Sequence, residues 1–581
     1  MYSQGIKKNI VVRTFKKNRS LGGNIHPLLE RLFLARGITS ETELDRTLTK
    51  LPSPWLLSGM EAMVDHLITA INEQQRICIV ADFDADGATS CAVAIKGLQL
   101  LGAGQVSFVV PNRFEYGYGL TPEIVELVKL QNPEVIITVD NGISSIDGVK
   151  AATEAGIKVL VTDHHLPGHE LPAADAIVNP NLLDDKFPSK SLAGVGVIFY
   201  VLMGLRSRLR EQNWFESHQV PEPNLAQLLD YVALGTVADV VALEQINRIL
   251  VHQGLLRIRT GRCHPGLNAL IEVSGKNPQT LGASDLGFSL GPRLNAAGRM
   301  DDMSLGIQCL LTDDSALAKD MAYQLDQLNN DRREVEAVMK HEAMAYLTDM
   351  KALDRHHLPS GVCLFDANWH QGVIGILASR IKDQVHRPVI AFAPAGKDLI
   401  KGSARSIPGV HIRDVLSDIA ALHPKLLSKF GGHAMAAGLS LNMHDYPAFA
   451  LAFDEMVSKR LASVDLEQKI LSDGQLTEQE MSLEIADLLQ NAATWGQEFP
   501  EPVFDGVFDV IQARIVGQRH LKLVLRKPEG DLIIDAIAFF VDKPEHWLGL
   551  RQIKAAYKLD INEFRGNRSV QFIVQYFEKI T

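Results

Sequence analysis

Three aspartates, each separated from the next by one residue, are the groups in this chain best suited to chemistry. Asp82, Asp84 and Asp86 follow the apolar run ICIVA and enter the small-residue turn DFDADGATS. Carboxylates packed this closely repel one another unless a cation holds them. Asp and Gly are also common in turns, and an EF-hand loop begins with a similar spacing of acids. That loop needs a flanking helix and a Glu at its twelfth position, whereas this motif follows an apolar run, so another kind of metal site is indicated.

Two later segments repeat this design. VIITVDNGIS carries Asp140 after an apolar run, and VLVTDHHLPGHE carries Asp163, His164 and His165 after another. Taken singly, such aspartates are also found as turn residues or helix N-caps. Carboxylates and imidazoles delivered from several strand ends to one place instead predict a divalent-metal site for two ions. Asp239, in GTVADVVAL, is the weakest member of the set, because a buried hydrogen-bonded carboxylate is an equally ordinary explanation.

Alternating helix-like and strand-like segments between about residues 60 and 200 are expected to position these groups. The strand-like segments are RICIVAD, QVSFVVPN, EVIITVD and KVLVTD, and a helix-like segment follows each of the first three. This repeated order predicts a mostly parallel sheet with helices on its faces. Ligands of such sheets bind outside the carboxyl ends of the strands, which is where Asp82, Asp140 and Asp163 fall.

At 581 residues, the chain is too long for a single core, so several domains are expected. Residues 313–350 are highly charged, lack Gly and Pro, and predict one long connecting helix. A second, smaller α/β domain is expected at 351–465, and the alternating pattern of HLKLVLRKPEGDLIIDAIAFF predicts a small β-domain at 466–581. Residues 51–312 would form the α/β domain with the metal site, preceded by a basic and helical segment at 1–50.

Composition narrows the class of protein. Hydrophobic residues make up 46% and charged residues 22% of the chain, which argues against disorder. The net charge of −11 gives no overall nucleic-acid signal, although it does not exclude local binding. A basic N-terminal arm precedes the first acidic residue, and a solvated tail is an equally ordinary explanation of its charge. The arm comprises Lys7, Lys8, Arg13, Lys16, Lys17 and Arg19. Without a signal peptide or a membrane span, and with five scattered cysteines and no CxxC, we expect a cytoplasmic protein that neither binds membranes nor contains disulfides.

The order of the motifs resembles a known family. DFDADG, TVDNG, TDHH and GTVADVV are similar to the four motifs of the DHH phosphoesterase superfamily. GPRLNAAGRMDD, NWHQGVIGILASR, KGSARS, KFGGHAMAAG and the C-terminal DINEFRGNRSVQ resemble the bacterial RecJ exonuclease family, over essentially the whole chain. The resemblance implies a parallel-sheet DHH domain, a long connecting helix, a smaller α/β DHHA1 domain and a C-terminal β-barrel of the OB-fold. Ala242 and Ala404 depart from common family residues without removing a functional group.

The resemblance also implies two divalent ions, Mn²⁺ or Mg²⁺. The implied metal ligands are Asp82, Asp84, Asp86, Asp140 as the bridge, His164 and Asp239. Asp163 and His165 would complete the catalytic set by orienting a ligand or contacting phosphate. A mixed carboxylate and imidazole set suits Mn²⁺ better than Mg²⁺. Two such ions activate water and stabilise the leaving 3′-oxygen, so a 5′-mononucleotide is the expected product. Which of the first three aspartates contact metal directly is left open.

A second set of residues is expected to bind the nucleic-acid strand. The resemblance implies that Arg113, Ser403 and Arg405, with Lys401 nearby, form a pocket for a 5′-terminal phosphate. The same cleft would be lined by Arg293, Asn295, Arg299, His370, Arg380, Gly431, Gly432 and His433. Tyr116 and Tyr118 could stack on bases, although isolated aromatics more often serve packing. The β-domain carries a charged face, which either binds single-stranded DNA or is merely solvated. Its residues are Arg514, Arg519, His520, Lys522, Arg526 and Lys527.

Three functions compete for this set of features. The first is a 5′→3′ exonuclease for single-stranded DNA that serves recombination and repair, as a monomer, together with a single-strand-binding protein and a helicase. The second is a phosphodiesterase of the same superfamily for short oligonucleotides or cyclic dinucleotides, which would not need the long helix and residues 470–581. The third is a non-catalytic DNA-binding scaffold, which the intact set of motif acids argues against. The first is therefore our expectation.

Overall fold

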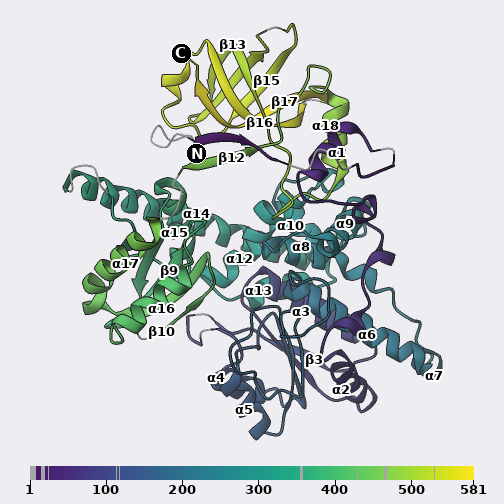
Figure 1. Ribbon diagram of the computed structural model, residues 1–581. Coiled ribbons are helices and arrows are strands. Elements are labelled where there is room, and N and C mark those ends of the chain that lie inside the picture. Colours follow the sequence, from purple (N-terminus) through teal and green to yellow (C-terminus); the bar gives the residue numbers. More distant parts are fainter. Residues whose placement is uncertain are drawn as a thin grey trace. The chain divides into compact units, whose positions relative to one another are not determined.

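The computed structural model describes residues 8–14, 20–23, 25–112, 114–116, 118–353, 358–427, 429–462, 467–528, 530–564 and 566–580 (Figure 1). The chain forms two compact units. The first unit contains residues 1–13, 330–486 and 503–581, and the second contains residues 14–329 and 487–502. Within the described ranges, no helix combines the length and the apolar character that crossing a bilayer requires.

A five-stranded parallel sheet forms the core of the second unit. Its strand order is β3-β2-β4-β5-β6. The strands are β2 (Ile77–Ala81), β3 (Val106–Val109), β4 (Val135–Val139), β5 (Lys158–Thr162) and β6 (Ala176–Val178). All five residues of β2 and of β4 are buried, as expected for strands covered on both faces. The predicted parallel sheet is confirmed, and β2, β4 and β5 all end at the same edge.

Helices cover this sheet and extend the unit. The first group is α1 (Pro27–Leu34), α2 (Met60–Asn72), α3 (Ala85–Leu100), α4 (Pro122–Lys129), α5 (Ile146–Glu154), α6 (Gly194–Glu211) and α7 (Trp214–Ser217). The second group is α8 (Leu229–Ala238), α9 (Gln245–Arg259), α10 (Pro265–Val273), α11 (Ala283–Asp285), the π-helical turn η6 (Leu286–Leu290), α12 (Gly291–Met300) and α13 (Ser304–Leu311). α4 and α5 share an apolar cluster with β2, β4 and β5, whereas α3 packs against α6 and α8.

The predicted long helix is confirmed as α14 (Ser315–Leu353), which has 39 residues. It is followed in the first unit by a mixed sheet of order β10-β11-β9-β8-β7. These strands are β7 (Val362–Phe365), β8 (Val389–Pro394), β9 (Leu399–Arg405), β10 (Lys429–Gly432) and β11 (Ala436–Asn442). The accompanying helices are α15 (Ile374–Val385), α16 (Ile412–Leu422) and α17 (Tyr446–Leu461). Ile400 and Ala404 of β9 enter the apolar core with α16 and α17, so Lys401, Ser403 and Arg405 lie on the opposite face.

The C-terminal segment forms a closed barrel, as expected. Its strand order is β13-β14-β15-β17-β16. The strands are β13 (Phe504–Val516), β14 (His520–Arg526), β15 (Ile533–Ala538), β16 (Gln552–Phe564) and β17 (Asn567–Lys579). Tyr557 and Phe572 stack in its interior with ring centroids 3.9 Å apart. Helix α18 (Leu483–Ala492) precedes the barrel.

One element of the first unit was not predicted. Strand β1 (Lys8–Val12), from the basic N-terminal arm, pairs in parallel with β12 (Gln468–Ser472). Arg13 then lies 3.6 Å from the buried carboxylate of Asp473. At least this part of the arm is therefore a strand, held by residues more than 450 positions away in the sequence.

Candidate active site

The first acidic motif is a tight strand-to-helix turn. Asp84 is the N-cap of α3, and its Oδ1 accepts hydrogen bonds from the backbone N–H groups of Asp86 (2.9 Å) and Gly87 (3.0 Å). A Cβ atom at Gly87 would lie 2.3 Å from the carbonyl oxygen of Asp82, so only glycine fits there. The turn therefore holds Asp82, Asp84 and Asp86 together at the end of β2.

Asp86 is fully buried and faces the start of α6. Its carboxylate accepts hydrogen bonds from the N–H groups of Gly194 (2.6 Å) and Val195 (3.0 Å), where the helix dipole favours negative charge. Burial and the neighbouring Asp84 nevertheless raise the pKa of Asp86 to about 7. A Cβ atom at Gly194 would lie 2.6 Å from the Cβ of Asp140, so this glycine lets two acidic motifs approach each other. Sequence reasoning missed Gly194, although a glycine at the start of an apolar helical run was visible in SLAGVGVIFY.

Asp140 is the most constrained residue of the site. Its φ angle is +61°, in the left-handed region that side chains other than Gly, Asn and Asp rarely adopt. The side chain of Asn141 fixes this loop by donating to the carbonyl oxygens of Val80 (3.0 Å) and Val139 (2.9 Å). Asp140 is 2% exposed, and its Oδ1 has no hydrogen-bond partner. Burial, together with the nearby acids of the first motif, raises its pKa well above the usual range.

Asp163 positions the two histidines that follow it. Its Oδ1 accepts hydrogen bonds from the backbone N–H groups of His164 (2.7 Å) and His165 (3.0 Å), and lies 2.7 Å from His165 Nδ1. Its Oδ2 accepts from the N–H of Ile143 at 2.9 Å. Although Asp163 is buried, these bonds lower its pKa. Both carboxylate oxygens are thus engaged with the protein, which is how a residue that orients ligands behaves.

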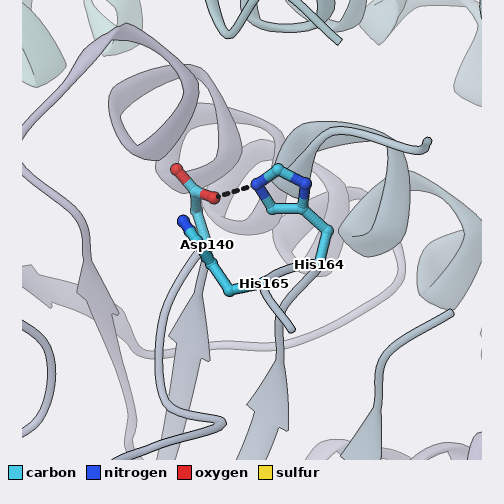
Figure 2. A group of neighbouring side chains, drawn as sticks. All are labelled: Asp140, His164 and His165. Carbon is cyan, nitrogen blue, oxygen red and sulfur yellow. Dashed lines mark ion pairs between the residues drawn. The ribbon is translucent and has the colours of Figure 1, made fainter. Parts of the chain in front are cut away.

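The two histidines carry different charges. His164 Nε2 lies 3.1 Å from Asp140 Oδ1 and 3.5 Å from Asp239 Oδ2, and Figure 2 shows its ring directed at Asp140. Burial and the adjacent His165 lower the pKa of His164 to about 4, so its ring is neutral and can offer a lone pair. Burial alone would lower the pKa of His165 as well, but the hydrogen bond with Asp163 raises it to about 9.

Ligand atoms from all four motifs come together. In each of three groups, the possible ligand atoms lie within 4.8 Å of one another; the groups are Asp82–Asp84–Asp140, Asp86–His164–Asp239 and Asp140–His164–His165. Asp140 and His164 each belong to two groups. Asp140 Oδ1 and His164 Nε2 are both buried without a hydrogen-bond partner. A set of carboxylate oxygens and imidazole nitrogens with such atoms at its centre fits divalent cations, Mn²⁺ in particular.

Helix α12 supports the first motif. Asn295 Oδ1 accepts a hydrogen bond from the N–H of Ala85 at 2.8 Å. A Cβ atom at Gly298 would lie 1.9 Å from the carbonyl oxygen of Phe83, so the helix contacts the turn directly. Arg293 is buried in an ion pair with Asp326 (2.8 Å). The expected strand-binding residues Asn295 and Arg293 therefore have structural contacts here, which the sequence motif did not reveal, and Arg299 lies half-buried in the last turn of the helix.

One face of the mixed sheet gathers several residues of the expected phosphate pocket. Lys401, Ser403 and Arg405 alternate along β9, and the strand register aligns Ser403 with Gly438 and then with Gly431. Arg405 donates to Ser403 Oγ (3.1 Å) and to the carbonyl oxygen of Ala404 (2.8 Å). No carboxylate among the described residues pairs with this guanidinium, and burial lowers its pKa. A Cβ atom at Gly431 or Gly438 would meet nothing within 4 Å, so the face is open beside Ser403.

The other expected strand-binding residues differ in their contacts. Arg113 lies outside the described residues. His370 Nδ1 accepts from the N–H of Gly372 (3.1 Å), and Arg380 pairs with Glu336 (2.9 Å) while its side chain stays half-exposed. The N–H of His433 donates to the carbonyl oxygen of Ala436 (2.8 Å), and the φ angle of +145° at Gly432 explains why glycine stands there.

The two tyrosines after Arg113 have distinct environments. Tyr116 packs against the apolar cluster of α4 and α5. The Tyr118 hydroxyl donates to the carbonyl oxygen of Asp140 (3.2 Å) and lies 3.3 Å from His165 Nδ1. Tyr118 therefore contacts the second and third motifs.

In the barrel, part of the expected basic face is already paired. Lys522 lies 2.8 Å from Asp535, Arg526 lies 3.5 Å from Asp509, and Lys527 donates to the carbonyl oxygen of Leu476. His520 contacts the rings of Phe539 and Phe540, both exposed, which sequence reasoning did not single out. The exposed cations of that set are Arg514 and Arg519.

Comparisons with known proteins cover almost the whole chain. Three family models match: the DHH family N-terminal domain at residues 76–236, the DHHA1 domain at 359–459 and the RecJ OB domain at 472–576. A protein named single-stranded-DNA-specific exonuclease RecJ from Salmonella typhimurium is 53% identical over 97% of both chains, and its namesake from Escherichia coli is 52% identical over the same shares. The crystal structure of RecJ in complex with Mn²⁺ from Thermus thermophilus has a TM-score of 0.78 and 28% identity, and covers 96% of this chain and 76% of that one.

Proposed function

This chain belongs to the RecJ family of single-stranded-DNA-specific exonucleases, and we propose that it hydrolyses single-stranded DNA from the 5′ end and releases 5′-mononucleotides. The observation that carries the proposal is the cluster around Asp140. There, acids and imidazoles from four separate segments converge, and the buried Asp140 Oδ1 and His164 Nε2 have no hydrogen-bond partner. When its carboxylates are ionised, such a cluster is stabilised by cations.

Divalent metal ions, Mn²⁺ or Mg²⁺, are the cofactors in this proposal. Asp140 would be shared between two ions, because it belongs to two of the three ligand groups. Asp82 and Asp84 would complete one set, and His164, with Asp86 and Asp239, the other. When bound, the ions lower the pKa of water and stabilise negative charge on the scissile phosphate and the leaving oxygen.

The residues of the chain prepare this chemistry by holding groups in place. Asp163 fixes the backbone of the DHH segment, so His164 keeps its lone pair directed at the cluster. His165 is cationic at neutral pH, because its pKa is raised to about 9. We therefore propose that it donates a hydrogen bond to a non-bridging oxygen of the scissile phosphate. Tyr118 restrains the same loop through the carbonyl oxygen of Asp140. No covalent nucleophile is required.

Capture of a 5′-terminal phosphate would explain the direction of degradation. Arg405 is a half-buried guanidinium without a carboxylate partner among the described residues, and an anion would compensate the hydration that its charge loses. Arg binds phosphate through parallel charge-assisted hydrogen bonds, and Ser403 Oγ lies within hydrogen-bonding distance of Arg405. Gly431 leaves space on this face for a phosphate group. We propose that further contacts to the strand come from His433, His370, Arg380, Arg299 and Arg113.

The remaining assignments concern cellular context. We propose that the barrel tracks single-stranded DNA, with Arg514 and Arg519 as its phosphate contacts. We further propose a cytoplasmic monomer that acts in recombination and repair beside a single-strand-binding protein and a helicase. The five-part domain division given above, with boundaries after residues 50, 312, 350 and 465, is part of this proposal.

End-labelled strands test the function. With Mn²⁺ and a 5′-labelled single strand, we expect labelled mononucleotide at the earliest times and poor attack on a blunt duplex. Efficient cleavage of dinucleotides but not of long strands would favour a phosphodiesterase for short substrates. Strand binding without cleavage in either Mn²⁺ or Mg²⁺ would favour a non-catalytic scaffold.

A further inference from the structure

Phe288 is a large apolar side chain that the second unit leaves mostly exposed. It is 81% exposed, although the other residues of its helix include the fully buried Leu286, Leu290 and Leu294. It lies on the π-helical turn η6, which joins α11 and α12 without a break, so residues 283–300 form one continuous helix. Single π-turns inside helices are frequent at functional sites.

This helix packs against the end of α8, which leads into one of the candidate metal ligands. A Cβ atom at Gly287 would lie 3.2 Å from the side chain of Val237, and one at Gly291 would lie 3.2 Å from that of Ala238. Asp239 follows directly in the sequence. The turn that exposes Phe288 is therefore seated beside a candidate metal-binding residue.

The other end of the same helix holds the first acidic motif. Asn295 accepts the N–H of Ala85, and Gly298 meets the carbonyl oxygen of Phe83. One rigid element thus contacts two of the segments that supply candidate metal ligands. A side chain on its exposed flank has a defined position relative to the candidate metal site.

Phe288 shares a helix face with residues of this motif. Phe288, Pro292, Asn295 and Arg299 are spaced four, three and four residues apart, which places them along one stripe of a helix. With a rise of about 1.5 Å per residue, Phe288 is about 10 Å along the axis from Asn295. At about 3.4 Å per nucleotide along one strand of a duplex, that offset corresponds to about three nucleotides.

We propose that Phe288 stacks on one base of the single strand that is bound for cleavage, and so determines how firmly the strand is held at the metal site. This inference rests on the proposed exonuclease function and adds a base contact to the phosphate contacts described above. Because every base has an aromatic face, the contact would be independent of sequence. It would favour single strands, since bases in a duplex are already stacked.

The test combines Phe288→Ala with substrates that lack one base. On a 5′-phosphorylated oligothymidylate with Mn²⁺, we expect kcat/KM to fall between about fivefold and about 100-fold, and Phe288→Tyr to retain most of it. Leu183→Ala is the matched control, because Leu183 is 89% exposed in the same unit. Its turnover should not change.

Abasic substrates separate stacking from a structural effect. If Phe288 stacks on a base, one abasic position should slow the native protein to the rate of Phe288→Ala and should leave the variant unaffected. Equal losses for both proteins at every abasic position, or an unchanged rate for Phe288→Ala, would overturn the proposal. Failure of the native protein to cleave any single strand would instead overturn the exonuclease function itself.

Discussion

The acidic cluster around Asp140 and the polar face of β9 are both electrostatically incomplete, but in opposite senses. In the cluster, buried carboxylates repel one another, and burial and this repulsion raise the pKa values of Asp140 and Asp239. On β9, burial lowers the pKa of Arg405, and no carboxylate of the described residues compensates its charge. The first region calls for cations and the second for an anion. Uncompensated charge at buried or half-buried positions therefore identifies the class of ligand more directly than overall composition does.

The largest effect should follow from removing the central charge of the acidic region. Asp140→Asn keeps a side chain that tolerates the positive φ angle, but removes the carboxylate that we propose binds metal. We expect turnover of single-stranded DNA to fall by at least about a thousandfold, while strand binding is retained. In EDTA the variant should unfold at a higher temperature than the native protein, because the native fold must either hold a repelled charge on Asp140 or protonate it.

Glu154→Gln, on an exposed position of α5, is the control and should leave both properties unchanged. Appreciable turnover by Asp140→Asn would rule out its role as the shared ligand.

Removing the uncompensated charge of the second region should have a smaller effect. For Arg405→Ala, we expect the preference for a 5′-phosphorylated over a 5′-hydroxyl end to fall by about 10- to 100-fold, because charge-assisted hydrogen bonds to phosphate are lost. Competition between the two labelled strands measures this. Arg413→Ala, an exposed arginine on α16, is the control. If the preference persists in Arg405→Ala, β9 is not the end-binding site.

A still smaller effect is expected from the support of the acidic region. Asn295→Ala leaves the N–H of Ala85 without its acceptor, so the first motif should be held less firmly. We expect the Mn²⁺ concentration for half-maximal activity to rise severalfold, with a smaller change at saturating Mn²⁺. A change in the Michaelis constant for DNA alone, at unchanged metal dependence, would instead indicate that Asn295 contacts the strand.

The weakest effect is a pH dependence of metal-free stability. Folding raises the pKa of Asp86 to about 7 and raises the pKa values of Asp140 and Asp239 well above their usual range. The folded state therefore gains stability when these carboxylates are protonated. This stability is fully present below about pH 4, the usual pKa of a carboxylate, and is lost as the pH rises through the pKa values of the folded state. In EDTA, the unfolding temperature should therefore rise by a few degrees between pH 8 and about pH 5. Saturating Mn²⁺ should remove this trend, because metal binding requires the ionised carboxylates. Identical profiles with and without Mn²⁺ would contradict it.

The sequence alone predicted the parallel sheet and the convergence of its acids. β2, β4 and β5 are apolar runs that end in Asp82, Asp140 and Asp163, and parallel strands present their carboxyl ends at one edge. Hydrophobic periodicity and strand-end chemistry are local properties, so they can be read along the chain. The same holds for α14, where uninterrupted helix-forming residues suffice.

What each of these side chains contacts depends on segments that are distant in the sequence and meet in the fold. Asp163 and Asp140 both follow apolar strands, yet the first has both oxygens bound by backbone and histidine N–H groups, and the second keeps Oδ1 without a hydrogen bond at the centre of the cluster. The contact of Asn295 with Ala85 spans 210 positions, and the lack of a carboxylate beside Arg405, among the residues described, is a property of the folded surroundings. The sequence shows which carboxylates, imidazoles and guanidinium groups are present. Their hydrogen-bond partners, and the charges that lack compensation, are set by contacts between distant segments.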